Sequence, residues 1–240
     1  MDRSSNPALR DDIFYRSLLS DTDNLMTIQG TINKTLLLLA LVLISAALVW
    51  ENYAVVLPFL LPAMIGGFVV ALITIFRQQW SPFTAPVYAL FEGVFLGGIS
   101  GFMDAAYPGI VVQAVILTFG VFFLLLIVFS TRLIQVTEKF RLVVIGATGA
   151  IMLLYLADIV LGFFGRPVGF IHESGLLGIG FSLFVVVIAS LNLILDFDYI
   201  EKGVEHGAPK YLEWYGAFAL LVTLVWLYLE ILRLLMKMRR

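Results

Sequence analysis

The chain lacks cysteine altogether, and it has only two histidines and little charge. Without cysteine there is no disulfide framework, thiol nucleophile, iron–sulfur cluster or thiolate zinc site. Charged residues make up 13% of its 240 residues, about half the share found in a typical soluble domain. The 15 lysines and arginines are balanced by 17 aspartates and glutamates, so there is no basic domain to bind nucleic acid. A soluble fold and a nucleic-acid-binding role are therefore both excluded.

Hydrophobic residues, in contrast, make up 61% of the chain and gather in long runs. A helix needs roughly 20 apolar residues to cross a bilayer, because its backbone groups can be satisfied there only internally. Seven runs are long enough, at approximately 35–53, 54–76, 83–103, 110–130, 142–165, 176–195 and 215–236. We predict an all-α, polytopic membrane protein with seven transmembrane helices in residues 34–240. The loops are too short to form domains.

The leader, residues 1–33, is charged and is expected to lie outside the membrane. Its first apolar run begins after about thirty residues, which does not fit a cleavable signal peptide with a short basic start. Asn6 and Pro7 form a helix-start pattern. Apolar residues then follow at helical spacing: Leu9, Ile13, Phe14 and Leu18. We predict a short amphipathic helix on the membrane surface, or an element packed against the loops.

The distribution of lysine and arginine predicts the orientation, since cytoplasmic loops carry the excess. Ten lie on the side of the N-terminus and five on the other side. The N-terminus is therefore predicted to be cytoplasmic. The basic C-terminal segment, with Arg233, Lys237, Arg239 and Arg240, is a dissenting signal because seven spans place it outside. No lysine falls inside the predicted spans.

Polar residues inside the predicted spans are the candidates for function, because ionisable groups are costly there and usually face a cavity or a partner. They are Glu92 in the third span, Asp158 in the fifth, Asn192, Asp196 and Asp198 at the end of the sixth, and Glu230 in the seventh. Several have structural alternatives. Glu230 can pair with Arg233 three residues on, Asp158 can be satisfied by Tyr155 or backbone, and Asp198 can be a solvated cap. Small residues at 93, 97 and 101 indicate close helix packing.

Signatures of intramembrane enzymes are weak. Residues 98–101 spell Gly-x-Ser-Gly, but a serine nucleophile needs a histidine at membrane depth, and His172 and His206 both fall in loops. Asp158 and Asp196 lack the Gly-x-Gly-Asp context of an aspartyl dyad. We therefore expect no catalytic residues and no cofactor.

Three stretches resemble the Bax inhibitor-1 superfamily, in particular its bacterial members. They are the third span around Pro86–Glu92, the Leu-Asp-Phe-Asp sequence ending at Asp198, and Leu232-Arg233 in the seventh span. The resemblance implies six helices packed around a central seventh, in a bacterial inner membrane. It also implies a pH-sensitive calcium leak, closed by a pair of aspartates on the sixth and seventh helices and a basic residue on the second.

Residue by residue, the resemblance assigns Asp196 to the aspartate of the sixth helix and Arg77 to its basic partner. Alignment on Arg233 places Thr223 where the second aspartate is expected. Asp198 and Glu92 are then the alternatives for the second carboxylate, and Glu230 lies two turns beyond Thr223.

The resulting hypothesis is a cation leak, with Ca²⁺ as the ion and Asp196 and Asp198 as its candidate ligands. Hard calcium ions prefer several oxygen ligands, which these acids, Glu92, Glu230, Thr223 and Asn192 can offer. Carboxylates that share a site compete for one proton, which supplies a pH switch without histidine. The alternatives are a non-conducting protein that restrains another membrane protein, such as a quality-control protease, and a transporter of a small solute.

Overall fold

The computed structural model describes residues 24–166 and 168–239, and their regular structure is helical, without a named strand. Seven long helices carry the fold: α2 (Ile28–Trp50), α3 (Tyr53–Phe76), α4 (Ser81–Ala106), α5 (Ile110–Ser130), α6 (Glu138–Phe163), α8 (Leu176–Glu205) and α9 (Leu212–Arg239). Two short helices, η1 (Gln78–Trp80) and α7 (Gly169–His172), lie in connections. The amphipathic helix predicted in the leader lies outside the described residues.

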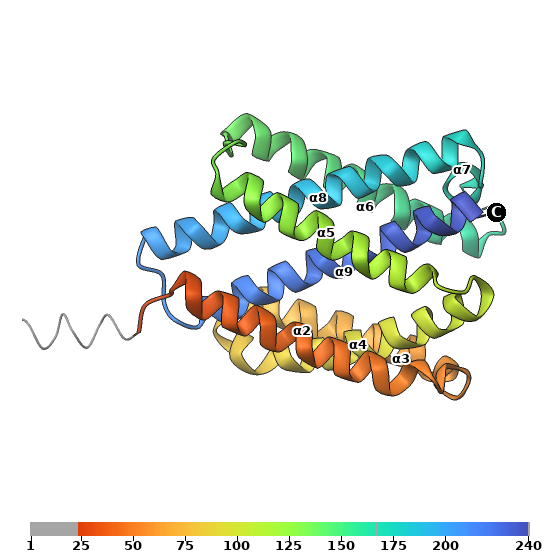
Figure 1. Cartoon of the computed structure of the whole chain (residues 1–240), viewed down its shortest axis with the longest axis horizontal. Helices are drawn as coiled ribbons and strands as arrows, with labels where there is room; N and C mark the ends of the chain where they lie inside the picture. The colour runs from red at the N-terminus through yellow and green to blue at the C-terminus, as the bar shows by residue number, and fades with distance from the viewer. Residues whose placement is uncertain (1–23, 167, 240) are drawn as a thin grey trace, which may run out of the picture.

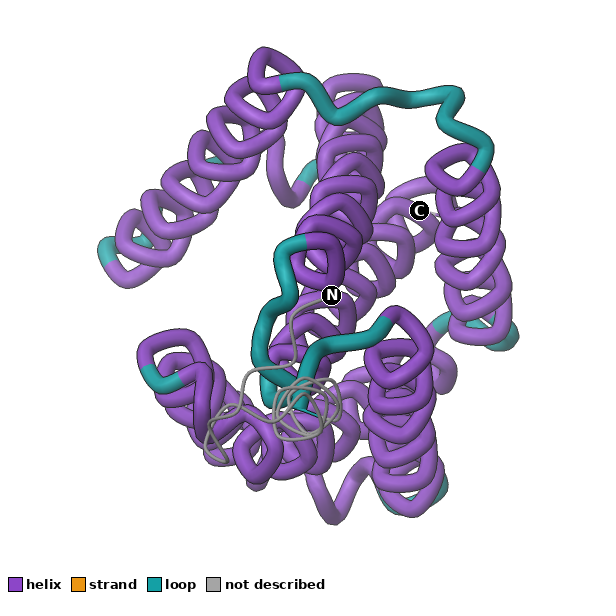
Figure 2. Tube along the Cα trace, turned by 90° about the vertical axis from the view of Figure 1, so that its left-hand side faces the viewer, coloured by secondary structure: helices purple, strands orange, loops and turns teal. Residues whose placement is uncertain are grey.

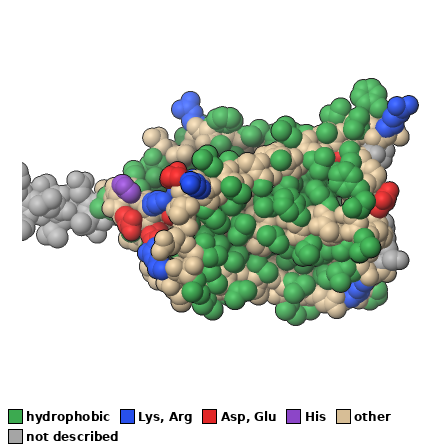
Figure 3. Space-filling view, turned by 90° about the horizontal axis from the view of Figure 1, so that it is seen from above, with side chains coloured by type: hydrophobic (Ala, Val, Ile, Leu, Met, Phe, Trp, Pro, Cys, Tyr) green, Lys and Arg blue, Asp and Glu red, His purple; other side chains and the backbone are tan. Residues whose placement is uncertain are grey.

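Each of the seven long helices is long and apolar enough to cross a membrane, which confirms the predicted fold class. They run back and forth along the long axis of the molecule (Figure 1), and Figure 2 shows them nearly end-on. Charged side chains gather at the two ends, with hydrophobic side chains between them (Figure 3). We call the end where α2 begins the N-terminal end of the bundle, and the end where α9 finishes the C-terminal end.

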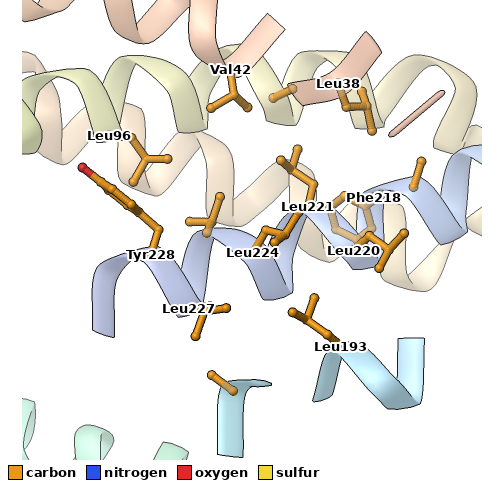
Figure 4. Close-up of a cluster of buried hydrophobic side chains, with 14 of the residues drawn as sticks. Leu38, Val42, Leu96, Leu193, Phe218, Leu220, Leu221, Leu224, Leu227 and Tyr228 are labelled. Carbon is orange, nitrogen blue, oxygen red and sulfur yellow. The ribbon is translucent and has the colours of Figure 1, made fainter. Parts of the chain in front are cut away.

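Helix α9 is the centre of the bundle. In its most apolar window 61% of the residues are buried, against 11% for α6 and 17% for α2 and α3. It packs directly against α2, α4, α5 and α8. Helix α3 packs mainly on α4, and α6 on α8. The largest core cluster therefore follows α9, with Leu221, Leu224 and Leu227 among its buried members (Figure 4).

The close approach of α4 to α2 depends on glycine. A Cβ atom on Gly97 would lie 2.5 Å from the backbone oxygen of Ala46, and one on Gly101 would lie 2.8 Å from that of Trp50. A Cβ atom on Gly93 would meet the side chain of Ser45. The small-residue pattern therefore serves helix packing, as predicted.

Helix α8 continues ten residues beyond its predicted end at 195. The extension is stabilised by Lys202, whose Nζ lies 2.8 Å from Oδ2 of Asp198 one turn earlier. Arg132 and Glu201 form a further ion pair across to the loop after α5, with Nη1 2.8 Å from Oε2. Asp196 and Asp198 therefore lie within a helix, two to three turns before its end.

The N-terminal end of the bundle is fastened to the start of α9. Glu213 is 1% exposed, and it accepts hydrogen bonds from the backbone N–H and hydroxyl of Thr27, at 2.9 and 2.8 Å. It also pairs with Lys34 of α2. Just before α2, the N–H of Met26 donates to the oxygen of Ala208 at 2.7 Å. The Lys34–Glu213 pair joins two helices that are far apart in sequence.

The basic C-terminal segment is tied to the C-terminal end of the bundle. Lys237 is 6% exposed, and its Nζ donates to the oxygen of Gly178 at 2.9 Å and to Oγ of Ser182 at 2.8 Å. Arg239 donates to the oxygen of Pro108 and to Gln113, each at 3.0 Å. The expectation that no lysine lies within a span is wrong, because the helices extend beyond the predicted spans and include Lys34 in α2, Lys139 in α6, Lys202 in α8 and Lys237 in α9. These contacts hold Lys237 and Arg239 at this end of the bundle, although basic residues favour the cytoplasmic side and the predicted topology places this end outside.

Candidate functional site

A cavity of about 520 Å³ opens between α6, α8 and α9 in the N-terminal half of the bundle. Its polar lining consists of four charged side chains, one amide and two tyrosines. They are Arg141, Asp196, Asp198, Lys202, Asn192, Tyr199 and Tyr215. Asn192 donates to the hydroxyl of Thr148 on α6 at 2.8 Å, so its amide bridges two walls of the cavity. The cavity contains the only two acids predicted at the end of the sixth span.

Asp196 is the acid without a full set of partners. Its Oδ2 atom is buried and has no hydrogen-bond partner among the described residues. The Thr223 hydroxyl of α9 lies close enough to donate a hydrogen bond to the same carboxyl group. A buried oxygen without a donor is uncommon, since leaving it unsatisfied costs about 1–3 kcal/mol. Asp196 is therefore available to bind a proton or a cation.

Asp198 is held by cations instead. Its Oδ2 accepts from Nη2 of Arg141 and from Nζ of Lys202, each at 2.8 Å. Residues two apart on a helix do not face each other, so Asp198 is directed away from the Asp196–Thr223 contact. Within 24–166 and 168–239, no three acids or histidines lie together as a metal site. Asp198 is therefore an ion-pair partner of Arg141 and Lys202 in this structure.

Two predicted site residues lie elsewhere in the bundle. Glu92 is partly buried at the α3–α4 contact, where a Cβ on Gly67 would lie 3.6 Å from its Oε2. Arg77 follows α3 and is exposed, and no described residue forms an ion pair with it. Neither residue lines the cavity of Asp196. The basic residues of that cavity are Arg141 and Lys202 rather than Arg77.

A second polar cluster lies further along α9, around Glu230. Glu230 is 2% exposed and accepts from the hydroxyl of Tyr155 at 2.9 Å and from Nη1 of Arg233 at 2.9 Å. Arg233 also donates to the Tyr155 hydroxyl at 2.6 Å and stacks over that ring. The ion pair between Glu230 and Arg233, weighed as an alternative to a role on the pathway, is therefore present.

An apolar layer separates the two polar regions. Ile151 of α6 and Val185 and Ile188 of α8 are buried together, and Trp226 of α9 packs against them. Thr223 and Glu230 are seven residues apart, which is about 10 Å along a helix. Trp226 lies between Thr223 and Glu230 on α9, so this hydrophobic cluster lies between the cavity of Asp196 and the cluster around Glu230.

The family model described as Bax inhibitor 1 like matches residues 5–240. The chain belongs to the Bax inhibitor 1 like family. No curated protein and no solved structure matches the chain. In this member of the family, threonine stands at 223, and the structure brings it to Asp196, the acid that the sequence resemblance selected.

Asp158 has a structural role in this family member. It accepts from the backbone N–H of Val168 at 2.8 Å, and His172 lies 2.8 Å from its Oδ2. The predicted backbone hydrogen bond to Asp158 is thus present, whereas the Tyr155 hydroxyl donates to Glu230 instead. Asp158 orders the connection between α6 and α8 at the C-terminal end.

Sequence reasoning did not identify Arg141, Lys202, Tyr199 or Tyr215 as contributors to the polar cavity, and it considered Tyr155 only as a partner of Asp158. Arg141 and Lys202 entered only the count of loop charges. The four-residue spacing of Asp198 and Lys202 was a signal for a longer helix. No comparable signal indicated that Arg141 on another helix would reach Asp198.

Proposed function

We propose that this protein is a pH-sensitive leak pathway for cations, with Ca²⁺ as the cargo. The observation that carries the proposal is the buried Oδ2 of Asp196, which has no hydrogen-bond partner in residues 24–166 and 168–239 and lies on the wall of a polar cavity. An oxygen in that setting is a ligand for a hard cation or a proton. The function uses neither a catalytic residue nor a cofactor.

The charges of the cavity support control by protonation. Arg141 and Lys202 contribute two positive charges, and Asp196 and Asp198 contribute two negative charges when both are ionised. Protonation of Asp196 leaves an excess of one positive charge, which repels an incoming cation. Because Asp198 is already paired with Arg141 and Lys202, Asp196 is the lining acid that can titrate without breaking an ion pair. The leak is therefore expected to fall as the pH falls.

The apolar layer supports the assignment of this structure to a closed state. A cation at Asp196 has no polar ligand before Glu230, and crossing the layer without water or ligands is costly. Opening requires Trp226 and Ile188 to separate, which means a movement of α9 against α8. Hydrophobic constrictions of this kind gate by exclusion of water.

The orientation decides which compartment the cavity faces. With the N-terminus in the cytoplasm of a bacterium and the bundle in its inner membrane, the Asp196 cavity opens toward the cytoplasm. The pH of that compartment then sets the protonation of Asp196.

The test is calcium flux through the purified full-length chain in liposomes, measured with an enclosed calcium dye at several pH values between about 5 and 8. We expect a flux that rises with pH. Vesicles that keep their calcium gradient at every pH would overturn the proposal and favour a non-conducting protein that binds another membrane protein. Transport of an organic solute without calcium flux would favour the transporter alternative.

A further inference from the structure

A groove runs along the side of the bundle between α2 and α5. These helices are neighbours at the front of Figure 1, with α9 behind and between them, but they are not packed against each other along their length. The groove consists of two adjoining cavities of about 270 and 110 Å³, and Leu39 and Phe119 line both of them. Leu220 and Leu221 of α9 form part of the floor. The groove is therefore open sideways, toward the hydrocarbon of a bilayer.

The larger cavity has the length of one leaflet. On α2 its lining extends from Ile28 to Leu39. The eleven steps between these residues correspond to about 17 Å of helix, close to half of a hydrocarbon core about 30 Å thick. Its opposite wall includes Phe123 and Leu126 of α5. The lining is almost wholly apolar, so an acyl chain lying parallel to the helices fits both its length and its chemistry.

A pair of opposite charges lies at the mouth of this cavity, at the N-terminal end of the bundle. Glu201 lines the cavity, and Arg132, whose side chain is 63% exposed, pairs with it. Arg132 also lies over the ring of Phe129, another lining residue. Arginine has five N–H donors and its two bonds to Glu201 use two of them, which leaves donors for a phosphate. A free lone pair on the Glu201 carboxylate can accept from an ammonium group.

We propose that this groove is a binding site for one aminophospholipid of the leaflet at the N-terminal end. One acyl chain lies between α2 and α5, the phosphate binds Arg132, and the ammonium group binds Glu201. A zwitterionic headgroup matches the neighbouring cation and anion, whereas an anionic headgroup without an amine satisfies Arg132 alone. The site is separate from the Asp196 cavity, and the proposal does not depend on the leak function.

The free energy of binding comes from packing and from the headgroup. An acyl chain gains no hydrophobic stabilisation when it moves from other lipids to a protein, because both surroundings are apolar. It gains dispersion contacts with a concave wall that would otherwise be poorly filled. The charged pair then selects among lipids that have the same acyl chains.

The experiment measures lipids retained by the full-length protein. The wild-type chain is placed in nanodiscs of equal parts phosphatidylethanolamine and phosphatidylglycerol with matched acyl chains. The protein is then released from the nanodiscs, and native mass spectrometry measures the mass of the protein with the lipids that it retains. We expect one retained phosphatidylethanolamine per chain. Leu126→Trp fills the groove from α5 and is expected to lower retention about tenfold, a loss of about 1.4 kcal/mol. Leu124→Trp is the matched control, since Leu124 is exposed on the same helix outside the groove.

Two further variants make the test independent of any folding defect in Leu126→Trp. Ile32→Trp narrows the groove from α2 and is expected to reduce retention in the same way, with helical circular dichroism unchanged. Arg132→Gln combined with Glu201→Gln is expected to abolish the preference for phosphatidylethanolamine, whereas Lys139→Gln in the same region preserves it. Retention that is equal in the wild type, both groove variants and Leu124→Trp would overturn the site. A headgroup preference that survives in the double variant would overturn the assignment to an aminophospholipid.

Discussion

The Thr223 hydroxyl of α9 lies within hydrogen-bonding reach of the Asp196 carboxyl of α8. The Oδ2 atom of Asp196 is buried, and none of the residues that the structure describes forms a hydrogen bond with it. Threonine can donate one hydrogen bond but cannot hold a second negative charge. Thr223 therefore adds no second acid beside Asp196, and substitutions at the two positions can test the role of Asp196.

Asp196→Asn is expected to flatten the dependence of calcium flux on pH, because the amide keeps the shape of the carboxyl group and cannot titrate. The measurement is flux in liposomes across the same pH range for wild type and variant. Asp104→Asn is the matched control, since Asp104 caps the backbone of Gly109 at the opposite end of the bundle. A pH profile unaltered by Asp196→Asn would remove Asp196 from the gating mechanism.

Thr223→Asp is expected to restore a pair of acids and to move the rise of flux toward higher pH. Two adjacent carboxylates share a proton that must be lost before both are ionised. Thr223→Val removes the hydroxyl at nearly constant volume and separates loss of the hydrogen bond from gain of the acid. If both variants show the wild-type profile, Asp196 works with a partner other than residue 223.

Trp226→Ala is expected to raise calcium flux severalfold at every pH, because it removes the largest side chain of the apolar layer between Thr223 and Glu230. Trp80→Ala is the control for loss of a tryptophan, since Trp80 is 56% exposed in η1. A calcium flux that stays at the wild-type value after Trp226→Ala would show that the closed state depends on another constriction.

Lys34→Met is expected to lower stability by about 3–5 kcal/mol, the usual consequence of leaving a buried acid without its cation. Glu213 is nearly inaccessible to solvent and would keep only the bonds from Thr27. The thermal unfolding midpoint of the detergent-solubilised protein measures the effect, with Lys139→Met as the matched control. An unchanged midpoint would mean that the Thr27 bonds alone hold the start of α2 to α9.

The predicted orientation is checked with a reporter that is active only in the cytoplasm. Fusions in the loops at 131–137 and 206–211 are expected to be active, and a fusion in the loop at 107–109 is expected to be inactive. The opposite pattern would place the Asp196 cavity on the outer side. Activity from both ends of the chain would show that one of the seven helices does not cross.

The sequence alone was sufficient for the number and approximate position of the spans, because burial in a bilayer depends on the apolar content of a continuous segment. Apolar content also explains why the predicted sixth span ends at 195, whereas α8 continues to Glu205. Beyond 195 the helix leaves the most apolar region, and it is continued by the Asp198–Lys202 pair and by contacts with Arg141, which hydropathy does not measure.

The partners of the buried acids were decided by tertiary structure. Asp196 and Asp198 are neighbours in sequence, yet a two-residue step turns a helix by about 200°, so one meets Thr223 and the other meets Arg141. Glu92 and Arg77 have the residue types of a gating pair, but α3 and α4 pack with each other and carry both residues away from the Asp196 cavity. Residue type showed which side chains are costly to bury. Only the packing of α6, α8 and α9 determined which of them share a cavity, since that depends on the rotation and contact of helices far apart in the chain.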